Sequence, residues 1–221
     1  MATQARRRAP LTRDRVLDAA LALVDEGGIE SLSMRKLGQA LGVEAMSLYN
    51  HVANKDDVLT GILERVAREI ERPSATEEWD VAIRKSAISA HDALQRHPWA
   101  CALMMTPEHV VPERIRYMES LLGRIREAGF TPAQTYHAYH VLDAHIFGFS
   151  LWLAGHAAGT AGVDPHELIQ RFMKEFPPEE YPNVAEHGEQ HLTEWPGKRT
   201  SPFELTLDLI LDGLRRMRAS A

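Results

Sequence analysis

Cysteine is almost missing from this chain of 221 residues, in which Cys101 is the single example. One cysteine excludes an internal disulfide. Its neighbours in the stretch WACALMM are apolar, which favours a small buried side chain over the alternative of a reactive thiol. The lack of disulfides is typical of a protein that works in a reducing cytoplasm.

Long hydrophobic runs are also missing. The longest, IFGFSLWLAG over residues 146–155, is too short to span a bilayer. No apolar segment of a signal peptide follows the arginines at positions 6–8, so we expect a cytoplasmic protein that is neither exported nor inserted into a membrane. With 44% hydrophobic and 25% charged residues, the chain is expected to form one or two globular domains rather than a disordered polymer.

Positive charge is not in excess, because the formal net charge is −6. Residues 1–72 hold 11 basic and 11 acidic residues, whereas residues 73–221 hold 14 and 20. The acidity therefore belongs to the C-terminal part. The negative total does not exclude nucleic-acid binding by the N-terminal third, which begins with the arginine cluster.

Alternating patterns typical of β-strands are missing as well, and helical spacing runs through nearly the whole chain, so the predicted fold class is all-α. Thr12 is placed to cap a first helix that Gly27 and Gly28 end, and Ser33 to cap a second that ends at Gly42. A third helix is predicted over 44–51, and a fourth begins after Asn54. A linker starting at Arg72 divides the chain into predicted domains 1–72, with a flexible basic tail over 1–9, and 73–221.

The C-terminal part shows further helical patterns. A stripe of Ile115, Met118, Leu122 and Ile125 is predicted to be buried, and the segment 131–155 is apolar almost all round. A helix is predicted over 165–176, followed by a loop of low order over 177–202. Both the 131–155 helix and the last helix are predicted to pair across a two-fold axis, the latter through a seam formed by Leu207, Ile210, Leu211 and Leu214.

The stretch MRKLGQALGVEAMSLYNHV, residues 34–52, combines two short helical patterns joined at Gly42. Neither helix is long enough to be stable alone, so we expect the first and fourth helices to cover their apolar sides. Such a pair is typical of a helix-turn-helix, whose second helix enters the DNA major groove; the alternative is a helical hairpin without a DNA role. The face predicted to remain exposed carries Ala45, Met46, Ser47, Tyr49, Asn50 and His51.

The segments GIESLSMRKLGQALGV and SLYNHVANKDDVL, within residues 28–59, resemble the DNA-binding domain of the tetracycline repressor (TetR) family of bacterial transcription factors. The resemblance implies an all-helical homodimer that binds a palindromic operator and that releases it when a small-molecule effector enters a tetracycline-repressor-like C-terminal domain. It also implies DNA contacts at Ser33, Arg35, Ala45, Met46, Ser47, Tyr49, His51 and Lys55.

These positions suit different contacts. Ser33 and Lys55, at helix N-termini, fit phosphates, and Arg35 fits either a phosphate or a guanine edge. Tyr49 either donates to a phosphate or packs across the turn, and His51 either contacts phosphate or caps the helix. Ala45, Met46 and Asn50 differ from the larger polar residues of the tetracycline repressor itself, so a different operator is expected. The arginine tail either enters the minor groove or stays solvated.

No catalytic motif is present in the C-terminal part, and the prediction is a regulator without enzymatic activity or cofactor. Apolar residues and one histidine that suit an effector pocket are Trp99, Met104, Met105, Met118, Leu122, His140, Phe147 and Trp152. Tetracycline is not the expected effector, because WACALMMTP lacks the histidine that its metal complex needs. The alternative is a helical metalloprotein or enzyme using the histidines of HAYHVLDAH or HGEQH, although neither segment matches a zinc-protease or di-metal pattern.

Overall fold

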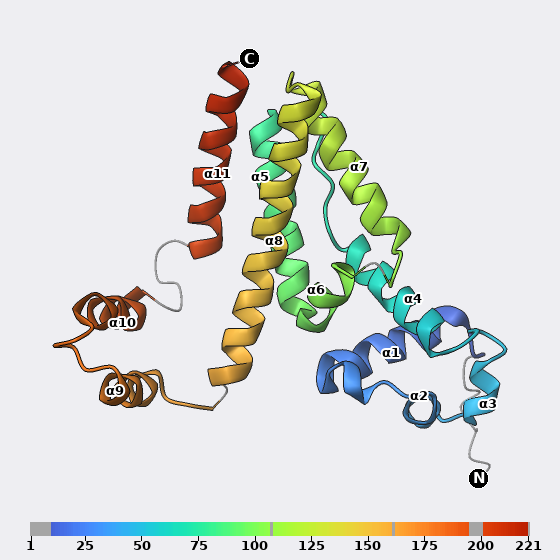
Figure 1. The fold of residues 1–221 in the computed structure, drawn as a ribbon. Helices are drawn as coiled ribbons and strands as arrows, with labels where there is room; N and C mark the ends of the chain where they lie inside the picture. Colours follow the sequence, from blue (N-terminus) through green and yellow to red (C-terminus); the bar gives the residue numbers. More distant parts are fainter. Residues whose placement is uncertain (1–9, 107, 161, 195–200, 221) are drawn as a thin grey trace, which may run out of the picture. The chain divides into compact units, whose positions relative to one another are not determined.

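The computed structural model describes residues 10–106, 108–160, 162–194 and 201–220, and all regular structure in these ranges is helical (Figure 1). The all-α prediction is confirmed. A single turn of 3-10 helix spans Ile29–Ser31, and the α-helices are α1 (Arg13–Gly27), α2 (Met34–Leu41), α3 (Ala45–Leu48), α4 (Lys55–Arg68), α5 (Trp79–Arg96), α6 (Pro98–Met104), α7 (Pro112–Glu127), α8 (Pro132–Thr160), α9 (Pro165–Glu175), α10 (Pro182–Glu194) and α11 (Pro202–Ala219).

The chain divides into two compact units that do not coincide with the two predicted domains. Unit 1 contains Met1–Arg72 together with Asp92–Ser120, and unit 2 contains Pro73–His91 together with Leu121–Ala221. The end of α5, all of α6 and the first half of α7 thus pack with the N-terminal helices. The domain boundary after residue 72 stays a prediction. The predicted basic tail over 1–9 lies outside the described residues.

The caps predicted for the N-terminal helices are confirmed. The hydroxyl of Thr12 accepts a hydrogen bond from the backbone N–H of Arg15 at 3.3 Å, and that of Ser33 accepts from Lys36 at 3.2 Å. The side-chain oxygen of Asn54 accepts from the N–H of Asp57 at 2.8 Å. Each bond satisfies a backbone donor that the first helical turn leaves without a partner. The starts of α1, α2 and α4 are therefore determined locally.

The turn between α2 and α3 depends on two glycines. Gly42 has φ 67° and ψ 39°, a left-handed conformation that often ends a helix. Glycine adopts it without steric strain because it has no Cβ. Gly38 allows the close approach of the next segment: a Cβ added to it would lie 2.9 Å from the carbonyl oxygen of Val43 and 3.2 Å from the N atom of Ala45. The N–H of Val43 donates to the carbonyl of Gly38 at 2.9 Å, which closes the turn.

Helix α3 is shorter than predicted. The prediction was 44–51, whereas the helix covers Ala45–Leu48 and residues 49–51 form turns. The N–H groups of His51 and Val52 both bond to the carbonyl of Leu48, at 2.8 and 3.0 Å, which tightens the end of the helix. Below it, Leu37 and Leu48 are fully buried, in the same unit as the buried stripe of α1 and α4.

Two predictions about α7 and α10 were wrong. Ile115 is 55% exposed and Met118 and Leu122 are only partly buried, so that of the predicted stripe Ile125 alone is buried, in a row with Tyr117 and Leu121. Both rows have helical spacing, so spacing alone does not select between them. Residues 182–194 form α10 rather than a loop; α10 packs on α9, with the methyl of Met173 at 3.1 Å from a Cβ built on Gly188.

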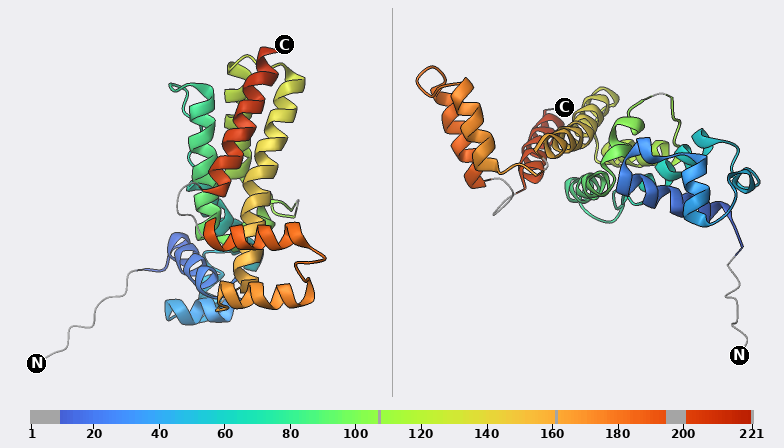
Figure 2. Two further views of the ribbon diagram at one scale, coloured as in Figure 1. Left: turned by 90° about the vertical axis from the view of Figure 1, so that its left-hand side faces the viewer. Right: turned by 90° about the horizontal axis from the view of Figure 1, so that it is seen from below.

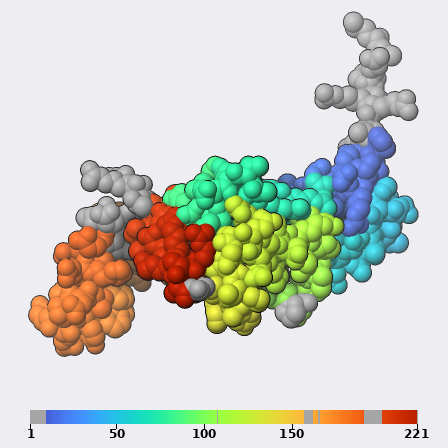
Figure 3. Space-filling view, turned by 90° about the horizontal axis from the view of Figure 1, so that it is seen from above, coloured from blue at the N-terminus to red at the C-terminus, as the bar shows by residue number. Residues whose placement is uncertain are grey.

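Helices α8 and α11 lie side by side in unit 2 (Figures 1 and 2). Their contact buries Leu207, Leu211 and Leu214, each at most 2% exposed, inside a single chain. These leucines pack within the chain, and Leu214 also lines the groove between α8 and α11. Their part in a dimer interface stays a prediction. Ile210 is partly exposed, and the outer side of α11, which lies at the surface in Figure 3, carries the exposed Leu205 and Leu209.

The apolar surface of α8 is only partly covered in one chain. Ala138, Leu142, Ile146 and Phe147 are buried, whereas Tyr136, Val141, Leu151 and Trp152 are between 40% and 59% exposed.

Cys101 is buried in unit 1, and burial raises the pKa of its thiol to about 11, so it is not a reactive thiolate. Among the described helices, none combines the length and apolarity that crossing a membrane requires.

Replacing Gly38 by alanine should displace the turn, because the new methyl meets backbone atoms that no side-chain rotation can move. We expect Gly38→Ala to lower the free energy of unfolding by about 1–3 kcal/mol, measured by urea denaturation. Gly123→Ala is the matched control in α7, where a Cβ meets nothing within 4 Å; it should be neutral or stabilise by up to ~1 kcal/mol. Equal stability of the two variants would contradict the close approach.

Candidate nucleic-acid interface

The outer face of α3 and of the turn after it carries the residues that the sequence predicted to be exposed. Met46 is 76% and Tyr49 45% exposed, and Asn50 is also exposed. Ala45, Ser47 and His51 are partly exposed. Because Leu48 points inward and is fully buried, these side chains face away from the core on one short segment. They offer a hydroxyl, an amide, an imidazole and a thioether, which suit hydrogen bonds to base edges or phosphates and contacts with thymine methyls.

Three flanking residues extend this face. Arg35 lies in the first turn of α2 and is exposed, and Lys55 is the first residue of α4 and is exposed. Ser33 is partly exposed beside the N-terminus of α2. Helix N-termini carry partial positive charge and unpaired N–H groups, so this set suits phosphate oxygens. The nine predicted DNA-binding residues lie between Ser33 and Lys55 in unit 1, and the structure leaves all of them at least partly exposed.

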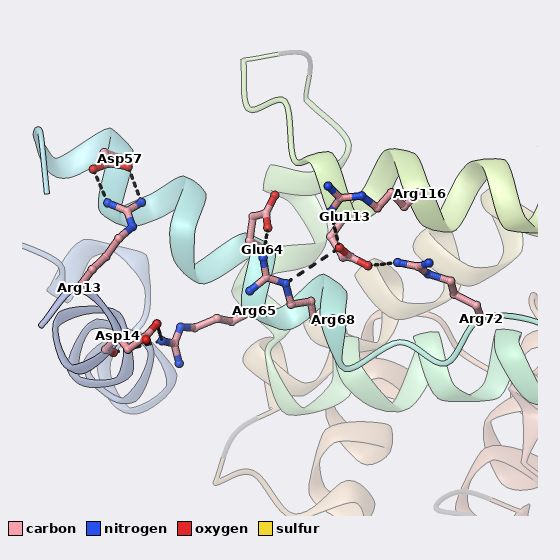
Figure 4. A network of polar contacts seen from close by, with 9 residues as sticks. All are labelled: Arg13, Asp14, Asp57, Glu64, Arg65, Arg68, Arg72, Glu113 and Arg116. Carbon is pink, nitrogen blue, oxygen red and sulfur yellow. Dashed lines mark hydrogen bonds and ion pairs between the residues drawn. The ribbon is translucent and has the colours of Figure 1, made fainter. Parts of the chain in front are cut away.

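An ion pair holds the segment that follows α3 (Figure 4). The guanidinium of Arg13 donates to both carboxylate oxygens of Asp57, at 2.7 and 2.6 Å, and to the carbonyl of His51 at 3.4 Å. Asp57 also accepts from the backbone N–H of Ala53 at 2.9 Å. The bonds from Arg13 lower the pKa of Asp57 to about 2, so this carboxylate is ionised throughout the neutral range. Helix α1 is thereby tied to both ends of the turn between α3 and α4.

A buried histidine connects α1 and the end of α4 to the start of α6. His97 is 7% exposed; its Nδ1 lies 2.7 Å from Oδ1 of Asp25 on α1, and its Nε2 lies 3.1 Å from Oε1 of Glu69, the C-cap of α4. Arg96 donates to the other oxygen of Glu69 at 3.0 and 2.6 Å, and the indole N–H of Trp99 donates to Asp25 at 2.7 Å. We call these five residues the α6 joint.

A second joint connects the end of α4 and the residues after it to α7 through arginines (Figure 4). Glu113, in the first turn of α7, accepts hydrogen bonds from Arg72 and, at 2.7 Å, from Arg116, and Arg68 lies 4.0 Å away. Arg116 and Arg72 lower the pKa of Glu113, which is therefore a stable anion. We call this group the α7 joint. The sequence analysis missed both joints, because their members are separated by up to 74 residues and carry no local motif.

The predicted effector residues are divided between the two units. Trp99, Met104, Met105 and Met118 belong to unit 1, and Leu122, His140, Phe147 and Trp152 belong to unit 2. Trp99 is bonded to Asp25, and Met104 and Phe147 are buried. His140 lines a groove of about 750 Å³ between α8 and α11 together with His137, Val141, Ile210, Gly213, Leu214 and Met217. The set of eight stays a prediction.

The C-terminal histidines have individual packing roles. Nδ1 of His91 lies 3.0 Å from the hydroxyl of Ser150, and Nε2 of His145 lies 3.0 Å from the carbonyl of Phe203. Both rings stack on Phe203, and burial lowers the pKa of His145. Within the described ranges, no three histidine, cysteine or acidic side chains come together in a way that could hold a metal ion.

Comparison with known proteins agrees with this architecture. The model described as "Bacterial regulatory proteins, tetR family" matches residues 16–62, and the one described as "Tetracyclin repressor-like, C-terminal domain" matches residues 72–218. The tetracycline repressor protein class D of Escherichia coli is 34% identical over 174 residues, which are 76% of this chain and 78% of that repressor.

Two further relatives are similar. The transcriptional repressor DrrR1 of Streptomyces coeruleorubidus is 34% identical over 140 residues, 62% of this chain and 52% of its own length. The crystal structure of the TetR family protein ActR of Streptomyces coelicolor, in complex with actinorhodin, superposes with a TM-score of 0.71 at 28% identity and covers 95% of this chain and 99% of ActR. On these matches and the helix-turn-helix geometry, the chain belongs to the tetR family of bacterial regulatory proteins and has a tetracycline-repressor-like C-terminal domain.

Proposed function

We propose that this DNA-binding regulator is a repressor that binds a palindromic operator as a homodimer and leaves it when a small molecule binds the C-terminal domain. The observation that carries the proposal is the exposed face of α3, held on a buried helix pair by the turn at Gly38 and Gly42. Support for the effector comes from relatives: ActR has been solved with actinorhodin, and DrrR1 and the class D protein are named as repressors.

Self-association is supported by the unpaired apolar surfaces of unit 2. Val141 and Leu151 on α8 and Leu205 and Leu209 on α11 are between 40% and 63% exposed. The groove between the two helices adds Ile210, Gly213 and Met217. A second copy packed on this surface would complete a four-helix interface with two-fold symmetry. Such a dimer presents two α3 helices, which must lie about 34 Å apart to enter successive major grooves.

Release of the operator requires only a difference in affinity. A ligand that binds the released conformation about 10⁴-fold more tightly than the DNA-bound one would invert a population from 99:1 to 1:99. Helix α4 is the proposed lever. Its N-terminus adjoins the DNA-binding face, and the other end is held at the α6 and α7 joints.

Selection of bound duplexes from a random pool tests the proposal as a whole. We expect an inverted repeat whose half-sites are centred about 10 base pairs, or one helical turn, apart. Affinity for the selected duplex should fall steeply with salt, because phosphate contacts release counterions. Recovery of no enriched sequence, or of a single half-site without symmetry, would contradict a dimeric operator-binding regulator.

Tyr49 provides a test of the DNA-binding face. We expect Tyr49→Ala to weaken binding to the selected operator by about tenfold, ~1.4 kcal/mol, without changing thermal stability, because the exposed side chain contributes to contact rather than to packing. Fluorescence anisotropy with labelled duplex measures the affinity. Tyr181→Ala is the matched control, since Tyr181 is 41% exposed in unit 2. Unchanged affinity of Tyr49→Ala would remove Tyr49 from the interface.

Leu209 provides a test of the dimer surface. Leu209→Glu would place a carboxylate in the proposed interface, where an unpaired charge is costly, and should weaken self-association by at least about 100-fold, ~2.7 kcal/mol. Sedimentation velocity over a range of concentrations measures the change. Val184→Glu, at a 39% exposed apolar position on α10, is the control and should leave the dimer intact. Dissociation by the α10 variant alone would place the interface elsewhere.

A further inference from the structure

The side chain of Met46 projects from α3 into solvent. It is 76% exposed, the highest value among the large apolar side chains in the ranges that the structure describes. A side chain so exposed buries little apolar surface within the chain, so the fold gains little from methionine at this position. Leu48, two residues along the same helix, is fully buried and holds α3 to the core. Met46 is therefore available for contact with a partner.

The segment 44–50, EAMSLYN, contains neither lysine nor arginine. Guanine is recognised in the major groove chiefly by these two side chains, which donate to its O6 and N7 atoms. The acidic residue of the segment, Glu44, is exposed at the N-cap of α3, and its side chain makes no capping hydrogen bond. A carboxylate accepts hydrogen bonds and cannot donate to guanine. Helix α3 therefore lacks the charged donors that most often select guanine.

The major groove presents one apolar group, the C5 methyl of thymine, among its hydrogen-bond donors and acceptors. The thioether side chain of Met46 is apolar, and its rotatable bonds allow it to adjust to the position of such a methyl. Ala45, which is partly exposed beside it, adds a second apolar group to the same surface. Contact with the methyl would remove apolar area from water, and the burial of one methyl changes an affinity by about fourfold. Thymine is thus the base that this surface complements.

We propose that Met46 is a specificity-determining residue that recognises the C5 methyl group of a thymine, so that each half-site carries an A·T pair opposite α3. The inference rests on the proposed function, in which α3 enters the major groove, and it adds the base and the atom that are recognised. Ser33 and Lys55 suit phosphates, and phosphate contacts fix the register of the protein on DNA without selecting a sequence. Discrimination between bases is the part that Met46 supplies.

Deoxyuridine tests the contact directly, because it lacks only the C5 methyl of thymidine and still pairs with adenine. The thymines of the selected operator are replaced by deoxyuridine one position at a time, in both half-sites together, and affinity is measured by fluorescence anisotropy. At one position we expect the wild type to lose about tenfold to twentyfold in affinity, since two methyl contacts are removed. Met46→Ala should lose less than about twofold at that position, because its side chain no longer reaches the methyl.

Val110→Ala is the matched control, because Val110 is apolar and 70% exposed in unit 1 but lies between α6 and α7, away from the segment that carries α3. It should show the same loss on the deoxyuridine duplex as the wild type. Both variants should keep the thermal stability of the wild type, since the replaced side chains are exposed. Equal losses for the wild type and Met46→Ala at every position would overturn the proposal, because the methyl would then act without Met46.

A second pair of duplexes restores the methyl on a different base. At the sensitive position of both half-sites, cytosine paired with guanine replaces thymine, and its C5 atom carries either hydrogen or a methyl group. We expect the wild type to bind the 5-methylcytosine duplex about threefold to tenfold more tightly than the unmethylated one, and Met46→Ala to bind the two equally. A methyl that leaves the affinity of the wild type unchanged would overturn recognition by Met46.

The failure of this inference can be told apart from the failure of the proposed function. If no operator can be selected, the proposed function is rejected, and recognition by Met46 with it. If an operator with an inverted repeat is selected but none of its thymine methyls acts through Met46, only the recognition by Met46 is rejected, and the dimeric operator-binding regulator stands.

Discussion

The close approach of the backbone at Gly38 to the backbone at Val43 and Ala45 is the constraint on which the DNA-binding face depends. With a side chain at position 38, the start of α3 could not lie against α2 as it does. Gly42 supplies the left-handed residue that reverses the chain within this short distance. Leu37 and Leu48 then meet the same core, and the other side of α3 is left exposed. The position of Met46 and Tyr49 follows from this contact.

Helix α3 is a single turn, so its direction has to come from its surroundings. The bidentate pair between Arg13 and Asp57 links α1 to the segment behind α3, and Asp57 also holds the N–H of Ala53. Partly exposed ion pairs contribute about 1 kcal/mol or less to stability. Their contribution here is geometric, because a carboxylate that accepts from a guanidinium and a backbone N–H allows few positions for the loop.

The parts of the fold that depend on neighbouring residues could be predicted from the sequence. Thr12, Ser33, Asn54 and Gly42 act within a few residues, and their caps and turn are where the pattern put them. The exposed face of α3 was predictable for the same reason. Once Leu48 is buried, the other side chains of so short a helix face outward. These local signals locate the short helices, whereas the DNA contacts of the nine candidate residues rest on the resemblance and stay a prediction.

Features decided by tertiary packing could not be predicted. Two rows on α7 fit the helical period, and only the packed chain selects Tyr117 and Leu121 over Met118 and Leu122. Helix α11 shows an apolar seam whether its partner is α8 or a second copy, so the pattern alone did not reveal that Leu207, Leu211 and Leu214 are buried within one chain. The proline and glycine residues of this region favoured a loop, whereas packing against α9 supports the helix α10. The α6 joint joins residues that are distant in sequence, and no spacing rule finds such contacts.

The end of α4 contributes a carboxylate to the α6 joint and arginines to the α7 joint, and this difference restricts the orientation of the helix. Glu69 faces the histidine of α6, whereas Arg68 and Arg72 face Glu113 of α7. Rotating α4 about its own axis would bring Glu69 toward Glu113, and like charges at such a distance repel. The pair of joints therefore specifies the rotation of α4. Because α4 begins directly after the turn that holds α3, the same rotation sets the angle at which the exposed face of α3 is presented.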